Sequence, residues 1–364
     1  MGPETGTCVV VTGMVFCLVV LLPGCGSAGA PQGSSCEAVR TQAVEPVVVP
    51  DQPSGNEDNA RTPFEAGIDL ALRFVPDRPV IYRVTTETEA SVRWEGDESG
   101  KPSSFRGGAI GNRVEITFEQ RVDRVQDDGN AMLKITILTL KYLGRSRETV
   151  VLDFDSSRDA DRESPLSQLV GISYHVEMTP KGAVLSVEGL ATLRDSLKGG
   201  SPEHQTALKL IGDKEIRDRH EVPALTASEG KIVRPGQTWS NVTILSFGRM
   251  GAKAYERLYT LERVEADEGG RVARVTMKGI PSSAAARQLH EDQSSTVPAG
   301  MFDNVDSYEG QFELDLDTGC IDTYVEQFHT EWVAVDQAAV QDGADRPAAV
   351  RMNRTQLYRL ERIP

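Results

Sequence analysis

Two runs of sequence and the turn between them decide the fold: RVEITFEQRVDRV at Arg113–Val125, DDGN at Asp127–Asn130 and AMLKITILTLKY at Ala131–Tyr142. In both runs apolar and polar residues alternate, which is the period of a half-buried strand. Asp and Asn tolerate, and Gly favours, the left-handed backbone that a tight hairpin turn needs. The segment therefore predicts two antiparallel strands joined by a short turn.

Further alternating runs predict that the rest of the chain is also antiparallel β. They lie at Ile68–Phe74 and Val80–Trp94, and a second hairpin joins Tyr174–Met178 to Val184–Val187 across Lys181-Gly182. Hairpins connect antiparallel neighbours, whereas parallel strands need long crossovers. The sequence therefore predicts an α+β fold that is predominantly antiparallel β. Such a sheet can take the form of an open or curved half-barrel.

The hairpin pattern returns about 140 residues further along the chain. Val122–Val125 is echoed by Leu261–Val264, and the hairpin at Lys181-Gly182 is echoed by Phe312–Val325. This similarity predicts two related β-rich halves, and their approximate bounds are 67–189 and 231–364. The alternative is chance similarity between hairpins, since turn chemistry puts Asp and Gly into all of them.

Residues 190–230, between the two halves, carry the clearest helical signals. Leu190, Leu193 and Leu197 share one helical face. Ser201-Pro202-Glu203 then supplies an N-cap, a proline at the first helical position and an early acid. We therefore expect a short helical segment that joins the halves.

An apolar run from Val9 to Leu22 precedes Pro23-Gly24-Cys25. The run is too short for a transmembrane helix, which needs about 20 apolar residues, but it suits the core of a secretory signal. The stretch resembles the lipobox of bacterial lipoproteins, in which an aliphatic residue stands three positions before the cysteine and a small residue one before. The resemblance implies that residues 1–24 are a lipoprotein signal peptide. It also implies that Cys25 is diacylated and becomes the mature N-terminus.

Two features depart from the lipobox pattern and leave an alternative open. Pro23 stands where that family prefers a small or β-branched residue, and residues 1–7 contain Glu4 but no Lys or Arg. The alternative is ordinary signal peptidase cleavage near Ala28–Ala30. Either route predicts export to the bacterial cell envelope, where the protein faces the periplasm or the exterior.

Residues 25–66 have no periodic apolar face and are rich in Pro, Gly, Ser, Glu and Asn, which predicts a flexible tether. Residues 67–364 then make up the β-rich domain. The chain carries a formal net charge of -15 and has a sequence pI near 4.9, so charge does not attract it to nucleic acid or anionic lipid. We expect contact with the membrane through the N-terminal lipid.

The sequence contains no recognisable catalytic or metal-binding motif. The five histidines lack zinc-site spacing, and there is no nucleophile elbow, phosphate-binding loop or Cys-x-x-Cys pair. We therefore predict no catalytic residues, no metal site and no cofactor. The acidic cluster Asp153–Glu163 is interpreted as a solvated loop, because Arg158 replaces the glycine that a calcium loop needs. Asp303, Asn304 and Asp306 near Tyr308 form a second, weaker cluster, which we interpret in the same way.

Two cysteines remain once the signal and the lipidated residue are set aside, Cys36 in the tether and Cys320 in the domain. They can pair in an oxidising compartment. The interpretation that we favour is that Cys320 is a small apolar residue on a strand.

From Ile68 to Ile363 the chain resembles an uncharacterised family of bacterial secreted and lipoprotein domains. The resemblance rests on four stretches, Val151–Ser156, Gly171–Gly189, Pro235–Trp239 and Phe312–Gly319. It implies no known activity. In outline, a large curved sheet with helices on one face is also similar to periplasmic lipoprotein-sorting carriers, which hold acyl chains in an open barrel.

These observations predict a membrane-anchored envelope lipoprotein that is non-enzymatic and binds an apolar ligand or a partner protein. One alternative is a cell-envelope hydrolase whose carboxylates come together from distant strands. Another is a structural envelope scaffold that binds proteins through a sheet edge. A deep pocket with two acids would favour the hydrolase, and the lack of any cavity would favour the scaffold.

Overall fold

The computed structural model describes residues 67–247, 252–267, 270–282, 303–335 and 348–364. The predicted signal peptide, Cys25, Cys36 and the tether lie outside the described residues. The chain divides into two compact units, and of the first only Pro102–Arg106 is described, a turn in which Phe105 N donates to Pro102 O over 2.8 Å. The second unit, residues 62–101 and 107–364, holds the secondary structure described below.

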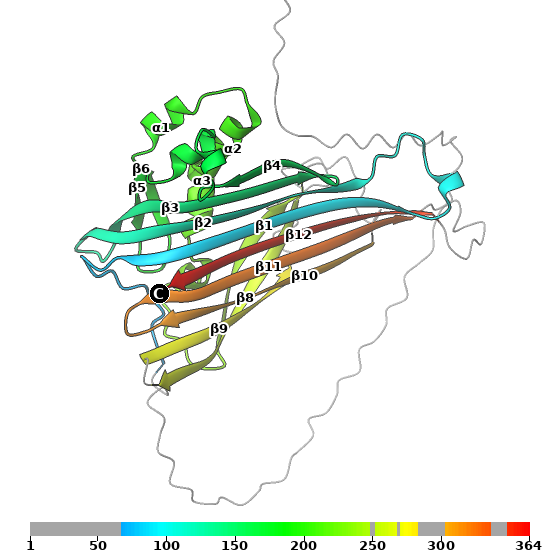
Figure 1. Cartoon of the computed structure of the whole chain (residues 1–364). Helices are drawn as coiled ribbons and strands as arrows, with labels where there is room; N and C mark the ends of the chain where they lie inside the picture. Colours follow the sequence, from blue (N-terminus) through cyan, green and yellow to red (C-terminus); the bar gives the residue numbers. More distant parts are fainter. Residues whose placement is uncertain (1–66, 248–251, 268–269, 283–302, 336–347) are drawn as a thin grey trace, which may run out of the picture. The chain divides into compact units, whose positions relative to one another are not determined.

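The second unit is built on one antiparallel sheet of twelve strands (Figure 1). The strands are β1 Val80–Glu95, β2 Gly108–Val125, β3 Ala131–Ser146, β4 Thr149–Asp155, β5 Ser173–Met178, β6 Val184–Glu188, β7 Thr238–Ser246, β8 Ala252–Asp267, β9 Gly270–Pro281, β10 Asp303–Asp315, β11 Cys320–Val335 and β12 Ala349–Ile363. Their order is β6-β5-β3-β2-β1-β12-β11-β10-β9-β8-β7, and β4 pairs with β3 beside β5. The prediction of a predominantly antiparallel β fold is confirmed, and the sheet is open.

The hairpin on which the prediction rests is β2–β3. Its turn places Gly129 at φ 86°, the left-handed region that glycine adopts freely. The alternating side chains Ile116, Phe118, Leu133 and Ile135 are at most 3% exposed and belong to the core. The alternation of apolar and polar residues in the sequence therefore corresponds to burial of the apolar side chains on one face of the sheet.

An irregularity in the pairing of β2 with β3 is found again in the pairing of β8 with β9. The β2–β3 ladder skips one residue between Val122 and Arg124, and the β8–β9 ladder skips one between Leu261 and Arg263. In each case two residues of one strand oppose one of the other, which is a β-bulge. The extra residue is acidic both times, Asp123 and Glu262.

The second pair of hairpins also shares a register shift. In β5–β6 it falls between Glu177 and Met178, and in β10–β11 it falls between Glu313 and Leu314. The strand order β6-β5-β3-β2-β1 at one end of the sheet is matched by β11-β10-β9-β8-β7 at the other, with β12 between the two sets.

The connector forms four short α-helices, α1 Ala191–Ser196, α2 Pro202–Leu210, α3 Asp213–His220 and α4 Pro223–Thr226. Three 3-10 turns lie elsewhere, Glu98–Gly100, Asp159–Asp161 and Pro165–Leu169. Ser201 caps α2 as predicted, because its Oγ accepts a hydrogen bond from His204 N over 3.3 Å. Sequence reasoning missed α3, since Ile216 is the single aliphatic residue in DKEIRDRH and leaves no periodic stripe.

The prediction of a strand at Ile68–Phe74 is wrong. Ile68 makes only an isolated bridge with Val233. Beyond it, Leu72 N donates to Pro180 O and Arg73 N donates to Gly319 O, over 2.8 and 3.1 Å. The backbone thus bonds to two hairpin turns instead of one neighbouring strand, although Leu70 is fully buried as the alternation required.

The helical connector packs on the inner face of the sheet, the face that carries the core side chains. Tyr174 Oη of β5 lies 2.8 Å from His220 Nε2, and Tyr358 Oη of β12 donates to Arg219 O over 2.8 Å. At the other end of the sheet, Trp239 Nε1 of β7 donates to Ala224 O over 2.8 Å. Figure 1 shows α1, α2 and α3 gathered beside β5 and β6.

A substitution at Gly319 tests how closely the turn between β10 and β11 packs against the backbone at Arg73. Its φ is 67°, and a Cβ there would collide with the backbone nitrogen of Arg73. Gly319→Ala should therefore lower the free energy of unfolding by about 3 kcal/mol. The matched control is Gly236→Ala, because Gly236 has φ 82° with open space around it and should lose only about 1 kcal/mol. Equal losses in urea unfolding would contradict this account.

Candidate functional site

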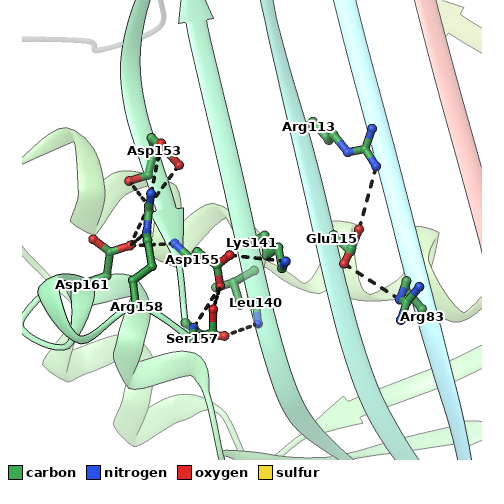
Figure 2. Close-up of polar contacts among 11 residues, drawn as sticks. Arg83, Arg113, Glu115, Leu140, Lys141, Asp153, Asp155, Ser157, Arg158 and Asp161 are labelled. Atoms are coloured by element: carbon green, nitrogen blue, oxygen red, sulfur yellow. Dashed lines mark hydrogen bonds and ion pairs between the residues drawn. The ribbon is translucent and has the colours of Figure 1, made fainter.

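The acidic loop after β4 is held by basic side chains of the same region (Figure 2). Arg158 Nη2 lies 3.0 Å from Asp153 Oδ1, and Arg158 Nε donates to Asp161 Oδ2 over 2.7 Å. Arg158 Nη2 also donates to the backbone oxygen of Asp153 over 2.9 Å. The residue that breaks the calcium-loop pattern in the sequence therefore pairs with two of the loop's carboxylates in the structure.

Asp155 in the same loop has partners of its own. Ser157 N donates to its carboxylate over 2.9 Å, and Lys141 Nζ lies 3.3 Å from it. The hydrogen bonds from the backbone and hydroxyl of Ser157 lower the pKa of Asp155, and Lys141 adds to the effect. Within the described residues no group of three or more His, Cys, Asp or Glu is placed to bind a metal ion.

The described histidines do not come together. His175 Nε2 lies 3.1 Å from Asp123 on the surface, and His204 contacts the Ser201 hydroxyl. His220 is buried against Phe118 with the ring centroids 4.9 Å apart, and burial followed by the nearby Arg219 charge lowers its pKa well below the usual value. His220 therefore stays neutral at ordinary pH.

The second acidic cluster is not a solvated loop where the structure describes it. Asp306 of β10 has a side chain that is 9% exposed, and its carboxylate lies 3.2 Å from Lys253 Nζ. Tyr255 Oη donates to it over 2.9 Å, and the Thr330 hydroxyl donates to the other oxygen. The expectation failed because closely spaced acids do not distinguish a loop from a strand, and Asp306 lies on β10, where it shares the inner face with Tyr308 and Phe312.

The most elaborate polar cluster lies on the inner face of β8, β10 and β11. Arg257 Nη1 lies 3.3 Å from Glu326 Oε1, and Arg257 Nε donates to Asn241 Oδ1 over 3.0 Å. Tyr308 Oη donates to Glu326 Oε2 over 2.9 Å, and Tyr324 Oη donates to Glu326 Oε1. The ion pair is thus buried and its carboxylate is bound on both oxygens.

Tyrosines surround this pair. Five of the eight tyrosines in the chain come together on this inner face: Tyr255, Tyr259, Tyr308, Tyr324 and Tyr358. Burial raises the pKa of Tyr308 and Tyr324, and the Glu326 carboxylate raises both further. These hydroxyls therefore remain protonated and act as hydrogen-bond donors to Glu326.

Sequence reasoning missed this cluster, although a signal for it was present. β8 reads Tyr255, Arg257, Tyr259 on alternate residues, and β11 reads Tyr324, Glu326, Phe328. Alternate residues of a strand share a face, so one charge in an otherwise aromatic row indicates a buried charge. The partner strands that bring Arg257 and Glu326 together are set by tertiary structure.

The best-defined cavities among the described residues are small. One lies beside the turn of Thr318, Gly319 and Cys320, and the other lies under α3 between Tyr82, Phe118 and Leu360. Each has a volume of about 30 Å³. That is room for a water or a similarly small species, far below the several hundred Å³ that ligand pockets usually have. Cys320 is a free, half-buried cysteine at the start of β11.

A family model described as a family of unknown function, DUF6263, matches residues 128–321, more than half of the chain. The chain belongs to this family. The DUF6263 match covers β3 to β10, the helical connector and Arg257. Glu326, the partner of Arg257, lies five residues beyond the end of the match.

The other comparisons add little about the function of this DUF6263 protein. No curated protein matches the chain. A solved structure described as "Lipid-protein interactions in lipovitellin" is similar with a TM-score of 0.35 and 11% identity, over 80% of this chain and 26% of that chain. The chain spans about a quarter of that protein, and a similarity this low carries no argument about function. None of the described helices is long and apolar enough to cross a membrane.

Substitutions at Arg257 and Glu326 test how their ion pair contributes to the stability of the fold. Arg257→Met leaves a buried carboxylate without its cation and should lower the free energy of unfolding by about 3 kcal/mol. The double variant Arg257→Met/Glu326→Met should recover most of that loss, because both charges are gone. Arg263→Met is the control, since the Arg263–Glu265 pair is exposed and should lose less than about 1 kcal/mol. Urea unfolding measures all three, and a double variant that is no more stable than Arg257→Met would contradict this account.

Proposed function

We propose that this DUF6263 protein is a lipid-anchored protein of the bacterial cell envelope that acts without enzymatic chemistry, by binding a partner protein through the β7 end of its sheet. The lipobox-like Leu22–Cys25 and the polar tether support the anchor. The tether would hold the sheet away from the membrane surface, where another envelope protein can reach it.

The observation that carries the proposal is the outer face of β7, β8 and β9. The sheet register places Val242 opposite Glu256, and Glu256 opposite Ile280, in one row across the three strands. Val242 is 51% exposed and Ile244, two residues along β7, is 54% exposed. Exposed apolar residues gathered at one place on a surface are typical of protein interfaces.

The outer face is different elsewhere in the sheet. On β1 and β2 it carries charged rows, in which Arg113 Nη1 lies 2.7 Å from Glu87 and Glu115 sits between Arg83 and Arg113 (Figure 2). Ionic rows of this kind keep a sheet face hydrated and discourage association. The exposed apolar residues Val242, Ile244 and Ile280 therefore differ from the ionic rows of β1 and β2.

β7 is also an edge strand with little protection. TWSNVTILS contains no charge and no proline, and its ladder with β8 has no bulge. The edge strands at the other end are capped: Arg217 of α3 donates to the backbone oxygens of Val184 and Leu185 in β6, and Arg158 caps Asp153 O in β4. On β7 the end carbonyl of Ser246 is capped, by Arg354 Nη1 over 2.9 Å. Apart from this contact at its end, β7 is an uncharged edge strand, and such an edge favours addition of a strand from another chain.

The charge of the chain indicates what kind of partner fits. A second copy would bring another net charge of -15, and the two copies would repel each other at low salt. A strand from a neutral or basic protein meets no such repulsion. We therefore propose an unlike envelope protein that presents a neutral or basic β-strand.

Apolar-ligand binding is the second candidate, favoured by the aromatic inner face. Tyr255, Tyr308 and Phe328 pack edge-on against one another there, with ring centroids 5.4 to 5.8 Å apart. A ligand the size of an acyl chain would have to displace the helical connector, because the cavities are small. The hydrolase alternative has less support, since the buried acids Asp306 and Glu326 are both held by cations and hydroxyls.

We also propose that the sheet arose from two related halves. The shared bulges at Asp123 and Glu262, the shared shifts in β5–β6 and β10–β11, and the matched strand order support this proposal. Chance similarity of hairpins could account for one shared bulge, but it accounts less well for a consistent set of shared irregularities in the same strand order. An experimental structure that lacked either bulge would count against it.

Cys25→Ala tests the anchor. Without the thiol no acyl chain can be attached, so the chain should move from the membrane fraction to the soluble fraction of the cell envelope and lose the mass of the lipid. Cys36→Ala is the matched control and should leave the protein in the membrane fraction. Fractionation and intact mass spectrometry read both results, and a Cys25→Ala protein that stays in the membrane fraction would exclude this anchor.

A photo-crosslinking amino acid at Val242 tests the binding surface in intact cells. It should give a discrete adduct with another envelope protein, because Val242 is an exposed apolar residue on the edge strand of the proposed surface. Val151 is the matched control, since it is 59% exposed on β4, where Arg158 and acidic residues flank the strand. The same adduct from both positions would contradict a specific surface, an adduct of twice the chain mass would indicate a second copy, and a lipid adduct would favour the second candidate.

A further inference from the structure

Among the described residues, Arg219, Arg257 and Asp315 are charged residues that are each at most 9% exposed, and Arg219 is the one of these three without an ion-pair partner. Arg257 pairs with Glu326 over 3.3 Å, and Asp315 pairs with Arg362 over 3.6 Å. Arg219 is 7% exposed, and no carboxylate in the described part of the chain pairs with it. A buried charge without a counterion is costly, so this guanidinium calls for an anion from elsewhere.

The neutral contacts of Arg219 do not supply a full negative charge. Arg219 Nη2 donates to Leu210 O over 2.7 Å, and Nη1 lies 3.4 Å from Tyr174 Oη. Leu210 ends α2, so its carbonyl carries part of the negative end of a short helix dipole. Guanidinium has five N–H donors, and these two acceptors satisfy only part of that set.

Arg219 and His220 line the cavity under α3, together with Gln120 of β2. Its volume of about 30 Å³ is enough for one or two water molecules or for one small monovalent anion. The other walls are apolar, among them Met178, Ile321 and Val222. A cation at the wall of a small, largely apolar cavity attracts an anion more strongly than the same charge on the surface.

We propose that this cavity binds one small monovalent anion of the chloride class, held by the Arg219 guanidinium with the Gln120 amide as a second donor. The anion supplies the negative charge that the described residues do not. The site lies where α3 meets the central strands β1, β2, β11 and β12, and Arg219 O accepts a hydrogen bond from Tyr358 of β12 there. Bound anion therefore stabilises the connector on the sheet, and a ligand that binds the folded state raises its stability by mass action.

The test measures the thermal midpoint of the full chain in neutral detergent, with sodium gluconate replaced stepwise by sodium chloride at constant ionic strength. The wild-type midpoint should rise by about 3 °C and then saturate. Arg219→Met should show no chloride response, and Gln120→Leu should show a weaker one. Arg217→Met is the matched control, because Arg217 is on the same helix but donates to β6 backbone oxygens, and it should respond like wild type.

A second measurement keeps the proposal falsifiable if Arg219→Met does not fold. Crystals grown in bromide should show an anomalous peak beside Arg219 and Gln120. A bromide peak only on the surface would overturn the proposal. So would a chloride response that is absent in wild type, or one that is the same in wild type and in Gln120→Leu. The anion site is separate from the proposed partner surface on β7–β9. Failure of the anion test would therefore leave the proposed function unaffected, and its success would not support that function.

Discussion

The ladder between β1 and β12 is the constraint on which the rest of the structure depends. It runs over fifteen residue pairs from Ile81–Ile363 to Glu95–Ala349 and joins the first strand of the chain to the last. Through it, two sets of hairpins that are each local in sequence become one open sheet with a common inner face. The cluster of Arg257 and Glu326 lies on that face, and the helical connector packs against it.

A large sheet has to cover its apolar inner face, and this chain does so in two ways. At the β5–β6 end the short helices supply the cover, and their contacts run through a few polar atoms, such as Tyr174 with His220 and Tyr358 with Arg219 O. At the β7–β9 end aromatic side chains of the strands pack against one another around a buried ion pair. Buried polar groups of this kind add specificity more readily than stability, because each has to find its own partner.

The two proposals concern opposite faces of the same sheet. The outer face is ionic on β1 and β2 and carries exposed apolar residues on β7 and β9, where the edge strand lacks charge, so its chemistry suits a partner protein. The inner face holds small cavities, and one of them has an unbalanced guanidinium, so its chemistry suits a small anion. A surface that recruits a partner and an ion that secures the core are compatible roles in one exported protein.

The sequence by itself determined what depends on neighbouring residues. Alternation and turn chemistry predicted the strands β2, β3, β5 and β6, and Ser201-Pro202 predicted the start of α2. Prediction from the sequence failed at Ile68–Phe74, because the backbone hydrogen bonds there go to two distant turns. It also missed α3, because a single aliphatic residue gives no periodic apolar stripe. Only the tertiary structure decided that Arg257 meets Glu326, that Asp306 is buried and that Arg219 lacks a counterion, because strand order across the sheet brings together residues that are far apart in sequence.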